Sequence, residues 1–360
     1  MPASELSTDP QPPSPEVFAA AAAAVPPAAR ASIARAVALV SADLADAEQT
    51  LATLLQSDIA EIPDVAGHVA FAGGKRLRPL VALLGAAASG ATLPHRVTVA
   101  AVGELVHTAT LLHDDVVDHG EFRRGRPAAR MTYGNGLAVL TGDFCLSAGL
   151  VALADTDQPQ AYRSLAQTIM RMSEGEVAQL CAAGSVPTRA RYYDIIDRKT
   201  AALLAWCASV GGLVPDAARE PLLRFGTELG FAFQIADDLL DIAPATGPGP
   251  HDAVSPGVTG KEAGQDLRDG KITLPLALAC ETDPELSDVV TAALQAGPPL
   301  ATGTVTAILA AAADTHALAQ ARAIAQQHAA AACAALSELP ESPARTALEE
   351  LTTYVVRRDR

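Results

Sequence analysis

Apolar residues recur at three- and four-residue steps along most of this chain, the spacing that places them on one face of an α-helix. From residue 32 to 60 the pattern includes Ile33, Val37, Val40 and Leu44. Similar spacing covers residues 97–120, most of 137–213, and 273–356. We find no convincing strand pattern and no internal repeat. The sequence therefore predicts an all-α fold with helices packed around a central cavity.

Two stretches interrupt this pattern. Residues 1–28 are rich in Pro, Ser and Ala with little periodicity, so we expect a mobile tail. Residues 242–260 are rich in Pro, Gly, Ser and Thr and are expected to form a long loop, either a lid or a tolerated insertion. The folded unit is then one domain over residues 29–360.

Two apolar stretches each carry aspartates in a D-D-x-x-D pattern. The first contains Asp114, Asp115 and Asp118, and the second contains Asp237, Asp238 and Asp241. On a helix the first and last aspartate of each pattern lie one turn apart on one face, with the middle one beside them. Bare carboxylates in apolar surroundings are costly without a cation. Rows of oxygen ligands favour Mg²⁺, which is commonly shared with substrate phosphates. Two such rows predict a metal-bridged diphosphate site.

A single acidic triplet is ambiguous, because such triplets also mark solvated helix faces and helix starts. Two copies, each preceded by an apolar run, are much harder to explain in that way. We therefore favour the metal-diphosphate interpretation for both rows.

Basic residues lie near these rows in sequence. Gly73 and Gly74 precede Lys75 and Arg78 in a stretch that could cradle an anion, although such a stretch is also a common helix start. Further candidates that bind substrate are His107, Arg123, Arg124, Lys199 with Thr200, Lys261 and Lys271. Guanidinium groups match phosphate oxygens. A lone helical histidine is more often structural, a lysine among apolar residues often reaches solvent, and the arginines could simply neutralise the acidic helix.

Composition narrows the class of protein. Of 360 residues, 49% are hydrophobic, but charges interrupt the apolar runs and none is convincing as a transmembrane span. The polar, Pro-rich start argues against a signal peptide. A net charge of -15 argues against a nucleic-acid partner. Five scattered cysteines suggest buried thiols in a reducing cytoplasm.

Taken together, these stretches resemble the trans-isoprenyl diphosphate synthase family from about residue 65 to the C-terminus. The motifs, in the family's order, are GGKRLRP (73–79), HDDVVD (113–118), RRG (123–125), GD (142–143), KT (199–200), FQIADDLLD (233–241) and GKEAGQDLRDGKITLP (260–275). The resemblance implies an isoprenoid synthase-type helical bundle around an elongation cavity, a homodimer, and head-to-tail condensation of isopentenyl diphosphate onto an allylic diphosphate.

The resemblance also assigns roles. Two or three Mg²⁺ ions would be held by Asp114, Asp118 and Asp237, with Asp115, Asp238 and Asp241 in support. The allylic diphosphate would also contact Arg123, Lys199 and Lys261. Isopentenyl diphosphate would lie in a metal-free pocket with Lys75, Arg78, His107 and Arg124. Thr200, Phe233 and Gln234 would line the allylic cation.

Chain length depends on the helix that bears Asp114. Ala109 and Thr110 stand five and four residues before it, and the small side chain at Ala109 leaves the tunnel open. ATLLHDDVVD and the ending YVVRRDR look like the octaprenyl, solanesyl and decaprenyl synthases that make quinone side chains. The starter would be geranyl, farnesyl or geranylgeranyl diphosphate, and the product would be passed to membrane enzymes. Met170 or Met172 could form the tunnel floor.

Several alternatives stay open. A geranylgeranyl or other short- or medium-chain synthase would share every motif, and a catalytically silent subunit would share the fold. A terpene cyclase would not need the GGKRLRP cradle for a second diphosphate. A carboxylate-bridged metal bundle predicts Glu-x-x-His motifs on two facing helices, and no such pair is present. The loop between Asp241 and Lys261 is longer than is usual in the family, by roughly ten residues, which bears on the placement of Lys261.

Overall fold

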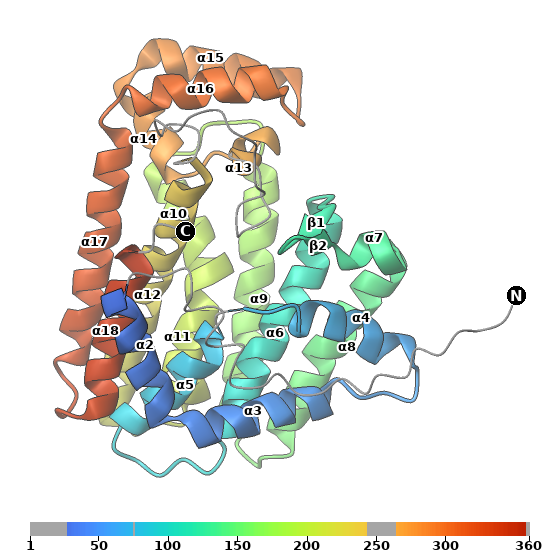
Figure 1. The fold of residues 1–360 in the computed structure, drawn as a ribbon, viewed down its shortest axis with the longest axis vertical. Coiled ribbons are helices and arrows are strands. Elements are labelled where there is room, and N and C mark those ends of the chain that lie inside the picture. Colours follow the sequence, from blue (N-terminus) through green and yellow to red (C-terminus); the bar gives the residue numbers. More distant parts are fainter. Residues whose placement is uncertain (1–26, 75, 243–263, 358–360) are drawn as a thin grey trace, which may run out of the picture.

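The computed structural model describes residues 27–74, 76–242 and 264–357, and these are almost entirely helical (Figure 1). The first helices are α2 (Pro27–Leu39), α3 (Ser41–Leu54), α4 (Glu61–Ala70), α5 (Leu77–Ala88), α6 (Arg96–Val117), α7 (Ala129–Tyr133), α8 (Asn135–Ala154) and α9 (Pro159–Ala182). Next come α10 (Arg189–Ile196), the π-helical turn η1 (Asp197–Ala201), α11 (Ala202–Ala208), the 3-10 turn η2 (Val210–Gly212) and α12 (Asp216–Ile242). The last are α13 (Gln265–Arg268), α14 (Leu274–Thr282), α15 (Pro284–Ala296), α16 (Thr302–Ala313), α17 (Ala317–Leu336) and α18 (Pro343–Arg357). The all-α fold class is confirmed.

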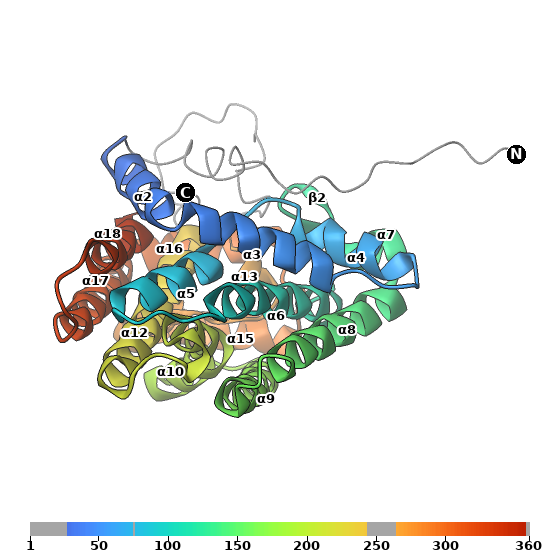
Figure 2. The same ribbon diagram turned by 90° about the horizontal axis from the view of Figure 1, so that it is seen from below.

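Helix α6 runs through the middle of the bundle, next to α5 and between α3 and the α10–α12 group, when the molecule is seen from below (Figure 2). Its long stretch of small and branched apolar residues, such as Val99, Ala100, Val102 and Leu105, is fully buried. A helix that is apolar nearly all round belongs in a core. This position explains how α6 carries the first aspartates into the interior.

Close helix contacts fix η1 and α11 against α12. A Cβ on Gly230 would lie 2.5 Å from Cα of Ala201, and a Cβ on Gly226 would lie 2.4 Å from Cα of Ala205. Both distances are shorter than side chains tolerate, so only glycine permits this approach. The two glycines therefore set the spacing between the elements that carry Lys199 and Gln234.

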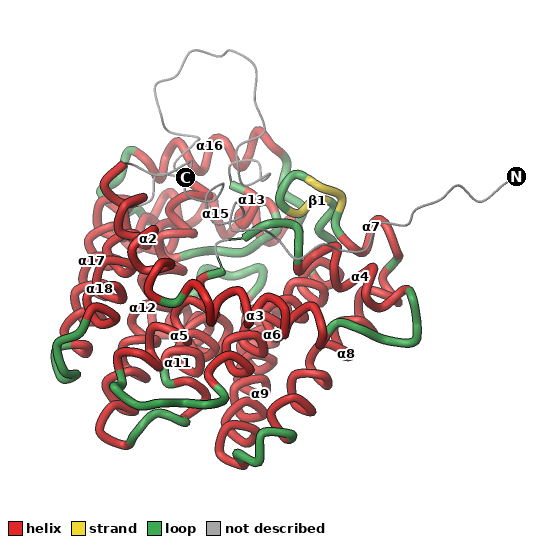
Figure 3. The backbone as a smooth tube through the Cα atoms, turned by 60° about the horizontal axis from the view of Figure 1, so that its bottom comes forward, coloured by secondary structure: helices red, strands yellow, loops and turns green. Residues whose placement is uncertain are grey.

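A second apolar core lies at the end of the bundle that α15 and α16 cover (Figure 1). The short helix α13 and a two-stranded hairpin, β1 (Phe122–Arg123) and β2 (Arg126–Pro127), lie at this same end (Figure 3). The hairpin turn places Arg124 and Gly125 at φ 52° and 75°, the geometry of a type I′ turn. We expected no strand here, so this hairpin is a correction.

Other boundaries also differ from the sequence expectation. The helix expected over residues 32–60 is two helices, because Val40 leaves the helical conformation at φ -127° and ψ 21°. Asn135 begins α8 instead of lying in a connection, and residues 155–158 separate α8 from α9. The expected tail overlaps α2 at Pro27, and its earlier residues lie outside the described residues, as does nearly all of the expected 242–260 loop.

Helix α8 is the one described helix long and apolar enough to cross a membrane. Its face with Ala138, Cys145, Gly149 and Leu153 is buried within the bundle, but only 33% of its apolar window is buried, and Leu140 and Val151 are exposed. All five cysteines are free thiols. Cys145, Cys207 and Cys280 are buried as expected, but Cys181 is exposed.

Candidate active site

The first aspartate row lies where α6 ends. Asp114 and Asp115 belong to its last turn, and Asp118 follows directly as the C-cap residue. Asp115 is buried and accepts hydrogen bonds from Arg123, with distances of 2.8 Å from Nε and 2.7 Å from Nη2 to Oδ1. Asp118 Oδ2 lies 2.6 Å from Lys271 Nζ. The two outer aspartates are half-buried, so they form the accessible part of the row.

The second row lies within α12. Asp237 and Asp241 are half-buried, whereas Asp238 is buried. Asp238 accepts hydrogen bonds from Tyr192 Oη at 2.5 Å and from Gln234 Nε2 at 2.9 Å. The middle aspartate of each row is therefore turned toward protein partners.

The carboxylate of Asp241 is held by the segment that follows the undescribed loop. Its oxygens accept hydrogen bonds from the backbone N–H groups of Gln265 and Asp266, each at 3.2 Å. The same segment ends at Lys271, which reaches Asp118 of the first row. Residues 264–271 thus connect the two rows.

The π-helical turn η1 connects the rows a second time through adjacent residues. Lys199 Nζ lies 3.9 Å from Asp114 Oδ2 and makes a closer ion pair with Glu176 of α9. Thr200 Oγ1 donates to Gln234 Oε1 at 2.8 Å. Single π turns inside helices are frequent at functional sites, and this one presents Lys199 to α6 and Thr200 to α12.

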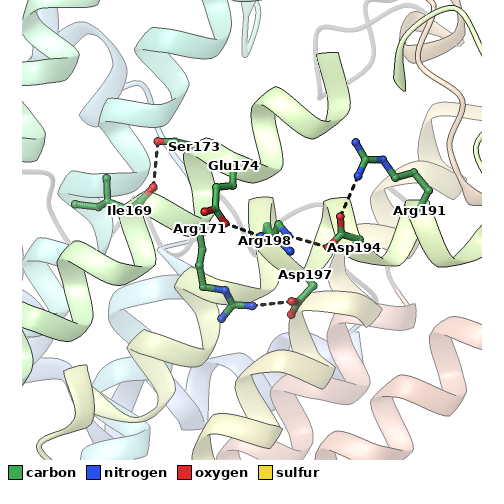
Figure 4. Close-up of polar contacts among 8 residues, drawn as sticks. All are labelled: Ile169, Arg171, Ser173, Glu174, Arg191, Asp194, Asp197 and Arg198. Carbon is green, nitrogen blue, oxygen red and sulfur yellow. Dashed lines mark hydrogen bonds and ion pairs between the residues drawn. The ribbon is translucent and has the colours of Figure 1, made fainter. Parts of the chain in front are cut away.

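The other side of η1 is held by an exposed network of ion pairs (Figure 4). Arg198 lies between Glu174 of α9 and Asp194 of α10, at 2.5 Å and 2.8 Å, while Arg171 pairs with Asp197 at 2.6 Å. A Cβ on Gly175 would lie 2.7 Å from the backbone N of Lys199, so α9 passes directly against the turn. Asp197 and Arg198 therefore belong to the exposed network, whereas the next two residues of η1, Lys199 and Thr200, face the site.

Crowded carboxylates set the electrostatics around Lys199. Burial, together with Glu176 and Asp118, raises the pKa of Asp114 to about 6 despite the nearby Lys199. Burial lowers the pKa of Lys199, but the charges of Asp114 and Glu176 outweigh it and leave that pKa raised. One carboxylate oxygen of Glu176, Oε1, is buried with no hydrogen-bond partner in the described part of the chain. Among the described residues, the carboxylates of the two rows and Glu176 outnumber the cations that pair with them, Arg123, Lys199 and Lys271.

This donor set suits Mg²⁺ that is shared with a diphosphate. Within residues 27–74, 76–242 and 264–357, no group of three or more Asp, Glu, His or Cys side chains is arranged to hold an ion alone. Mg²⁺ uses one or two carboxylates and fills its other positions with waters and substrate phosphates. The excess negative charge and the oxygen-only ligands fit such an ion.

A separate cluster of cations surrounds His107. Arg78, Arg124, Arg123 and Arg76 all lie close enough to add to burial in lowering the pKa of His107 well below its usual value. A neutral imidazole follows. A Cβ on Gly74 would lie 3.1 Å from Nη1 and Nη2 of Arg124, so the glycine leaves room for that guanidinium. These residues come from α5, α6, the hairpin and the loop before α5, and they form a cationic cluster around His107.

Arg78 Nε in this cluster is buried and has no hydrogen-bond partner among the described residues. Burial lowers the pKa of Arg78, with Glu104 as the main opposing charge. A buried guanidinium with an unused donor is suited to an anionic ligand. Lys75 and Lys261, both expected at the diphosphates, lie outside the described residues.

Arg76 has a different role from its basic neighbours, which the sequence did not indicate. It is 2% exposed, adopts φ 46°, and pairs with Glu48 at 2.7 Å and Glu104 at 3.0 Å. Glu48 and Glu104 come from α3 and α6. This buried triad anchors the loop that carries Gly74 and leads into Arg78.

The residues expected to control chain length lie on α6 as predicted. Ala109 is fully buried, and Thr110 is half-buried with its hydroxyl donating to the carbonyl of His107 at 2.8 Å. Of the two methionines considered for the tunnel floor, Met172 is buried and Met170 is 57% exposed. Met172 is therefore the better candidate.

Three polar residues of this site were not identified from the sequence as candidates: Glu176, Tyr192 and Arg76. Each has other polar or charged residues close by in the sequence, such as Lys75 beside Arg76 and Arg191 beside Tyr192, so no local sequence feature marks them out. Their partners come from distant segments, so the spacing along the chain does not reveal the contacts.

Comparisons with known proteins identify the family of this chain. Residues 60–312 match the polyprenyl synthetase family. A heptaprenyl diphosphate synthase component 2 from Geobacillus stearothermophilus is 35% identical over 327 residues, which cover 89% of this chain and 97% of the relative. An all-trans-nonaprenyl-diphosphate synthase from Rhodobacter capsulatus, described as geranyl-diphosphate specific, is 37% identical over 324 residues, 89% of this chain and 96% of the relative.

The comparison with solved structures also finds a polyprenyl synthase. The crystal structure of a polyprenyl synthase from Caulobacter crescentus CB15, complexed with calcium and isoprenyl diphosphate, has a TM-score of 0.83 and 37% identity, covering 91% of this chain and 98% of that chain. The family resemblance seen in the motifs is confirmed, and this chain belongs to the polyprenyl synthetase family of prenyltransferases.

Proposed function

We propose that this chain condenses isopentenyl diphosphate head-to-tail onto an allylic diphosphate and repeats the step to give a long-chain all-trans polyprenyl diphosphate. The observation that carries this proposal is the presence of two differently charged regions along the C-terminal half of α6. One is acidic and contains Asp114 and Asp118, with Asp237 proposed to join them, and the other is the cationic cluster around His107. Two diphosphate substrates need two such regions.

In this proposal the allylic diphosphate binds at the aspartate rows. Asp114, Asp118 and Asp237 would hold two or three Mg²⁺ ions, whose Lewis acidity stabilises the charge that develops on the departing diphosphate. Lys199 and Lys271 already pair with the first row at 3.9 Å and 2.6 Å, so both ammonium groups are within reach of a phosphate bound there. Arg123 and Lys261 are expected to contribute as well.

Isopentenyl diphosphate would bind at the cationic cluster without metal. Arg78 and Arg124 would each donate N–H groups to its phosphates, and Lys75 is expected to join them. Neutral His107 can donate one hydrogen bond without adding charge. The unused donor at Arg78 Nε supports this assignment.

Ionisation of the allylic substrate leaves a cation that the double bond of isopentenyl diphosphate attacks. Thr200, Gln234 and Phe233 are proposed to face this cation, with an oxygen dipole from Thr200 and the π face of Phe233 stabilising it. The proton lost after the attack passes to the departing diphosphate. Thr200 directly follows Lys199, so leaving-group binding and cation stabilisation come from one turn.

A long product is supported by the alanine at position 109 and by the names of the relatives that make seven- and nine-unit chains. Geranyl, farnesyl or geranylgeranyl diphosphate would serve as the starter. We propose a cytoplasmic enzyme whose product is passed to membrane enzymes that attach quinone side chains. A geranylgeranyl synthase is the alternative, because the methyl group of Ala109 does not itself set a floor.

A homodimer is proposed from the apolar outer faces of α8 and α9. The exposed residues there include Leu140 at 66%, Val151 at 59%, Met170 at 57% and Val177 at 58%. A hollow of about 370 Å³ on α9, lined by Tyr162, Met170 and their neighbours, lies on the same helix. Apolar patches of this extent typically mark interaction surfaces.

The test is product analysis of the purified protein with Mg²⁺, carbon-labelled isopentenyl diphosphate and each of the three starters, with chain length determined by chromatography. Products of seven to ten units support the proposal. A product that stops at four units would place the enzyme in the geranylgeranyl class, and no product from any starter would favour a silent subunit that needs a partner chain.

A further inference from the structure

We propose that Tyr192 and Asp238 are positioning residues that fix the direction of the hydrogen bonds of Gln234 and Thr200, so that Thr200 turns oxygen lone pairs toward the allylic cation. This inference rests on the proposed function, because it concerns the same site. It assigns a role to a tyrosine with no other role in the chemistry, and to the one aspartate of the second row that is buried.

The four side chains form a continuous chain. Tyr192 Oη donates to Asp238 Oδ2 at 2.5 Å, Gln234 Nε2 donates to Asp238 Oδ1 at 2.9 Å, and Thr200 Oγ1 donates to Gln234 Oε1 at 2.8 Å. Tyr192, Thr200 and Asp238 are buried. Networks of this kind are rigid when every member is satisfied.

The direction of each bond follows from Asp238, the group that only accepts hydrogen bonds in this network. Asp238 acts as an acceptor on both of its oxygens, so the amide of Gln234 turns its NH₂ group toward Asp238 and its carbonyl oxygen toward Thr200. Thr200 has one hydroxyl hydrogen, and it is used in the bond to Gln234. Only lone pairs of Thr200 Oγ1 remain for a neighbouring group.

The direction in which the Thr200 hydroxyl points matters for a carbocation. An oxygen lone pair stabilises a positive charge, whereas a hydroxyl hydrogen pointing at it destabilises it, and both effects are strong where water is excluded. If Gln234 turned over, its NH₂ group would donate to Thr200 and free the hydroxyl hydrogen. Tyr192 opposes this reversal because its hydroxyl group donates to Oδ2 of Asp238 while Gln234 donates to Oδ1, so both carboxylate oxygens act as acceptors.

Tyr193 offers a matched control. It is adjacent in α10, but its hydroxyl lies 2.9 Å from His328 Nε2 of α17, outside the chain to Asp238. Tyr192→Phe and Tyr193→Phe therefore each remove one hydroxyl group from neighbouring positions. Only the first change touches the network that ends at Thr200.

The experiment measures binding of two unreactive analogues of the allylic diphosphate to the full chain with Mg²⁺ by calorimetry. One analogue carries an ammonium nitrogen where the cation develops, and the other carries a neutral carbon there. We expect Tyr192→Phe to lower the affinity for the ammonium analogue by about tenfold, the effect of one charge-assisted hydrogen bond, with the neutral analogue unchanged. Tyr193→Phe should change neither affinity.

An equal loss for both analogues, or no loss for either, would overturn the proposal, since neither result depends on the charge of the ligand. If Tyr192→Phe does not fold, the ratio of the two affinities in Asp238→Asn decides. A general loss of Mg²⁺ binding would lower both affinities and leave their ratio unchanged, whereas a disturbed bond direction, with the new NH₂ group facing Tyr192 or Gln234, would lower the ratio of the ammonium to the neutral analogue about tenfold. Failure of the proposed function is distinguishable: it would show as absence of condensation by the wild-type chain, whatever the variants bind.

Discussion

The ammonium nitrogen of Lys199 lies 3.9 Å from Oδ2 of Asp114, although the two residues come from η1 and α6. Lys199 is held there by its closer ion pair with Glu176 of α9. A diphosphate bound at the first aspartate row would therefore meet a cation that is already in place. Holding a charged group in its working position lowers the reorganisation needed in the transition state.

This relationship predicts the effect of Glu176→Gln. The amide keeps the shape of the side chain but loses the charge that orients Lys199, so we expect the KM for the allylic diphosphate to rise severalfold with a smaller change in kcat. Steady-state kinetics at saturating isopentenyl diphosphate would measure this. Glu174→Gln is the control, because Glu174 is on the same helix but faces Arg198 on the outer side of η1 (Figure 4). Equal KM values in the two variants would contradict the prediction.

Removing an outer aspartate should abolish most of the activity. Asp114→Ala and Asp237→Ala each delete a proposed Mg²⁺ ligand, and we expect turnover to fall by about a hundredfold or more. The far-UV spectrum and melting temperature should remain those of a folded protein. Asp216→Ala serves as the control, because Asp216 lies at the exposed start of α12, the helix that also carries Asp237. Full activity of either site variant would remove that residue from the metal site.

Metal binding should stabilise the protein more as pH rises. Asp114 has a folded pKa of about 6, raised from 3.8, so the folded state holds its proton more tightly than the unfolded state does. Stability from this group is present at low pH and is lost as pH rises through that range. Mg²⁺ would relieve the repulsion among the ionised carboxylates.

We therefore expect the increase in melting temperature caused by Mg²⁺ to be larger at about pH 7.5 than at about pH 5. Thermal unfolding with and without Mg²⁺ at both values would measure it. In Asp114→Asn the dependence on pH should be weaker. A shift of the same size at both pH values in the wild-type chain would argue against this origin of the effect.

The two aspartate rows and the fold class were predictable because they depend on periodicity. Residues three and four apart share a helix face, so Asp114 with Asp118, and Asp237 with Asp241, could be placed from their spacing. The middle aspartates were harder. Asp115 and Asp238 face Arg123 and Tyr192, and nothing in a D-D-x-x-D spacing identifies partners that other segments supply.

The basic stretch before α5 shows the same limit. Lys75, Arg76 and Arg78 look alike in sequence, but Arg76 is buried in an ion triad while Arg78 Nε is left without a partner among the described residues. Which cation becomes structural depends on Glu48 of α3 and Glu104 of α6. The hairpin that carries Arg124 was missed because its strands are two residues long, too short to give an alternating pattern.

Enlarging Ala109 should shorten the product. Ala109 is fully buried on α6, one helical turn and a residue before Asp114, so a phenylalanine there would project into the space proposed for the growing chain. We expect Ala109→Phe to move the product distribution to fewer isoprene units, read by chromatography. Melting temperature is measured in parallel, because overpacking a filled core costs about 1–3 kcal/mol. An unchanged product length with a large loss of stability would mean that the tunnel runs elsewhere.

The triad around Arg76 should dominate the stability of the cationic cluster. Arg76→Met would leave Glu48 and Glu104 buried without their cation, and breaking a buried pair in this way costs roughly 3–5 kcal/mol. Urea unfolding should show the midpoint falling by a corresponding amount. Arg35→Met is the matched control, since Arg35 is 59% exposed in its pair with Glu350, and exposed pairs contribute about 0–1 kcal/mol. Because the triad holds the loop that leads into Arg78, the KM for isopentenyl diphosphate should also rise in Arg76→Met under conditions where the variant is folded. Similar unfolding midpoints for the two variants would mean that this loop is held by its other contacts.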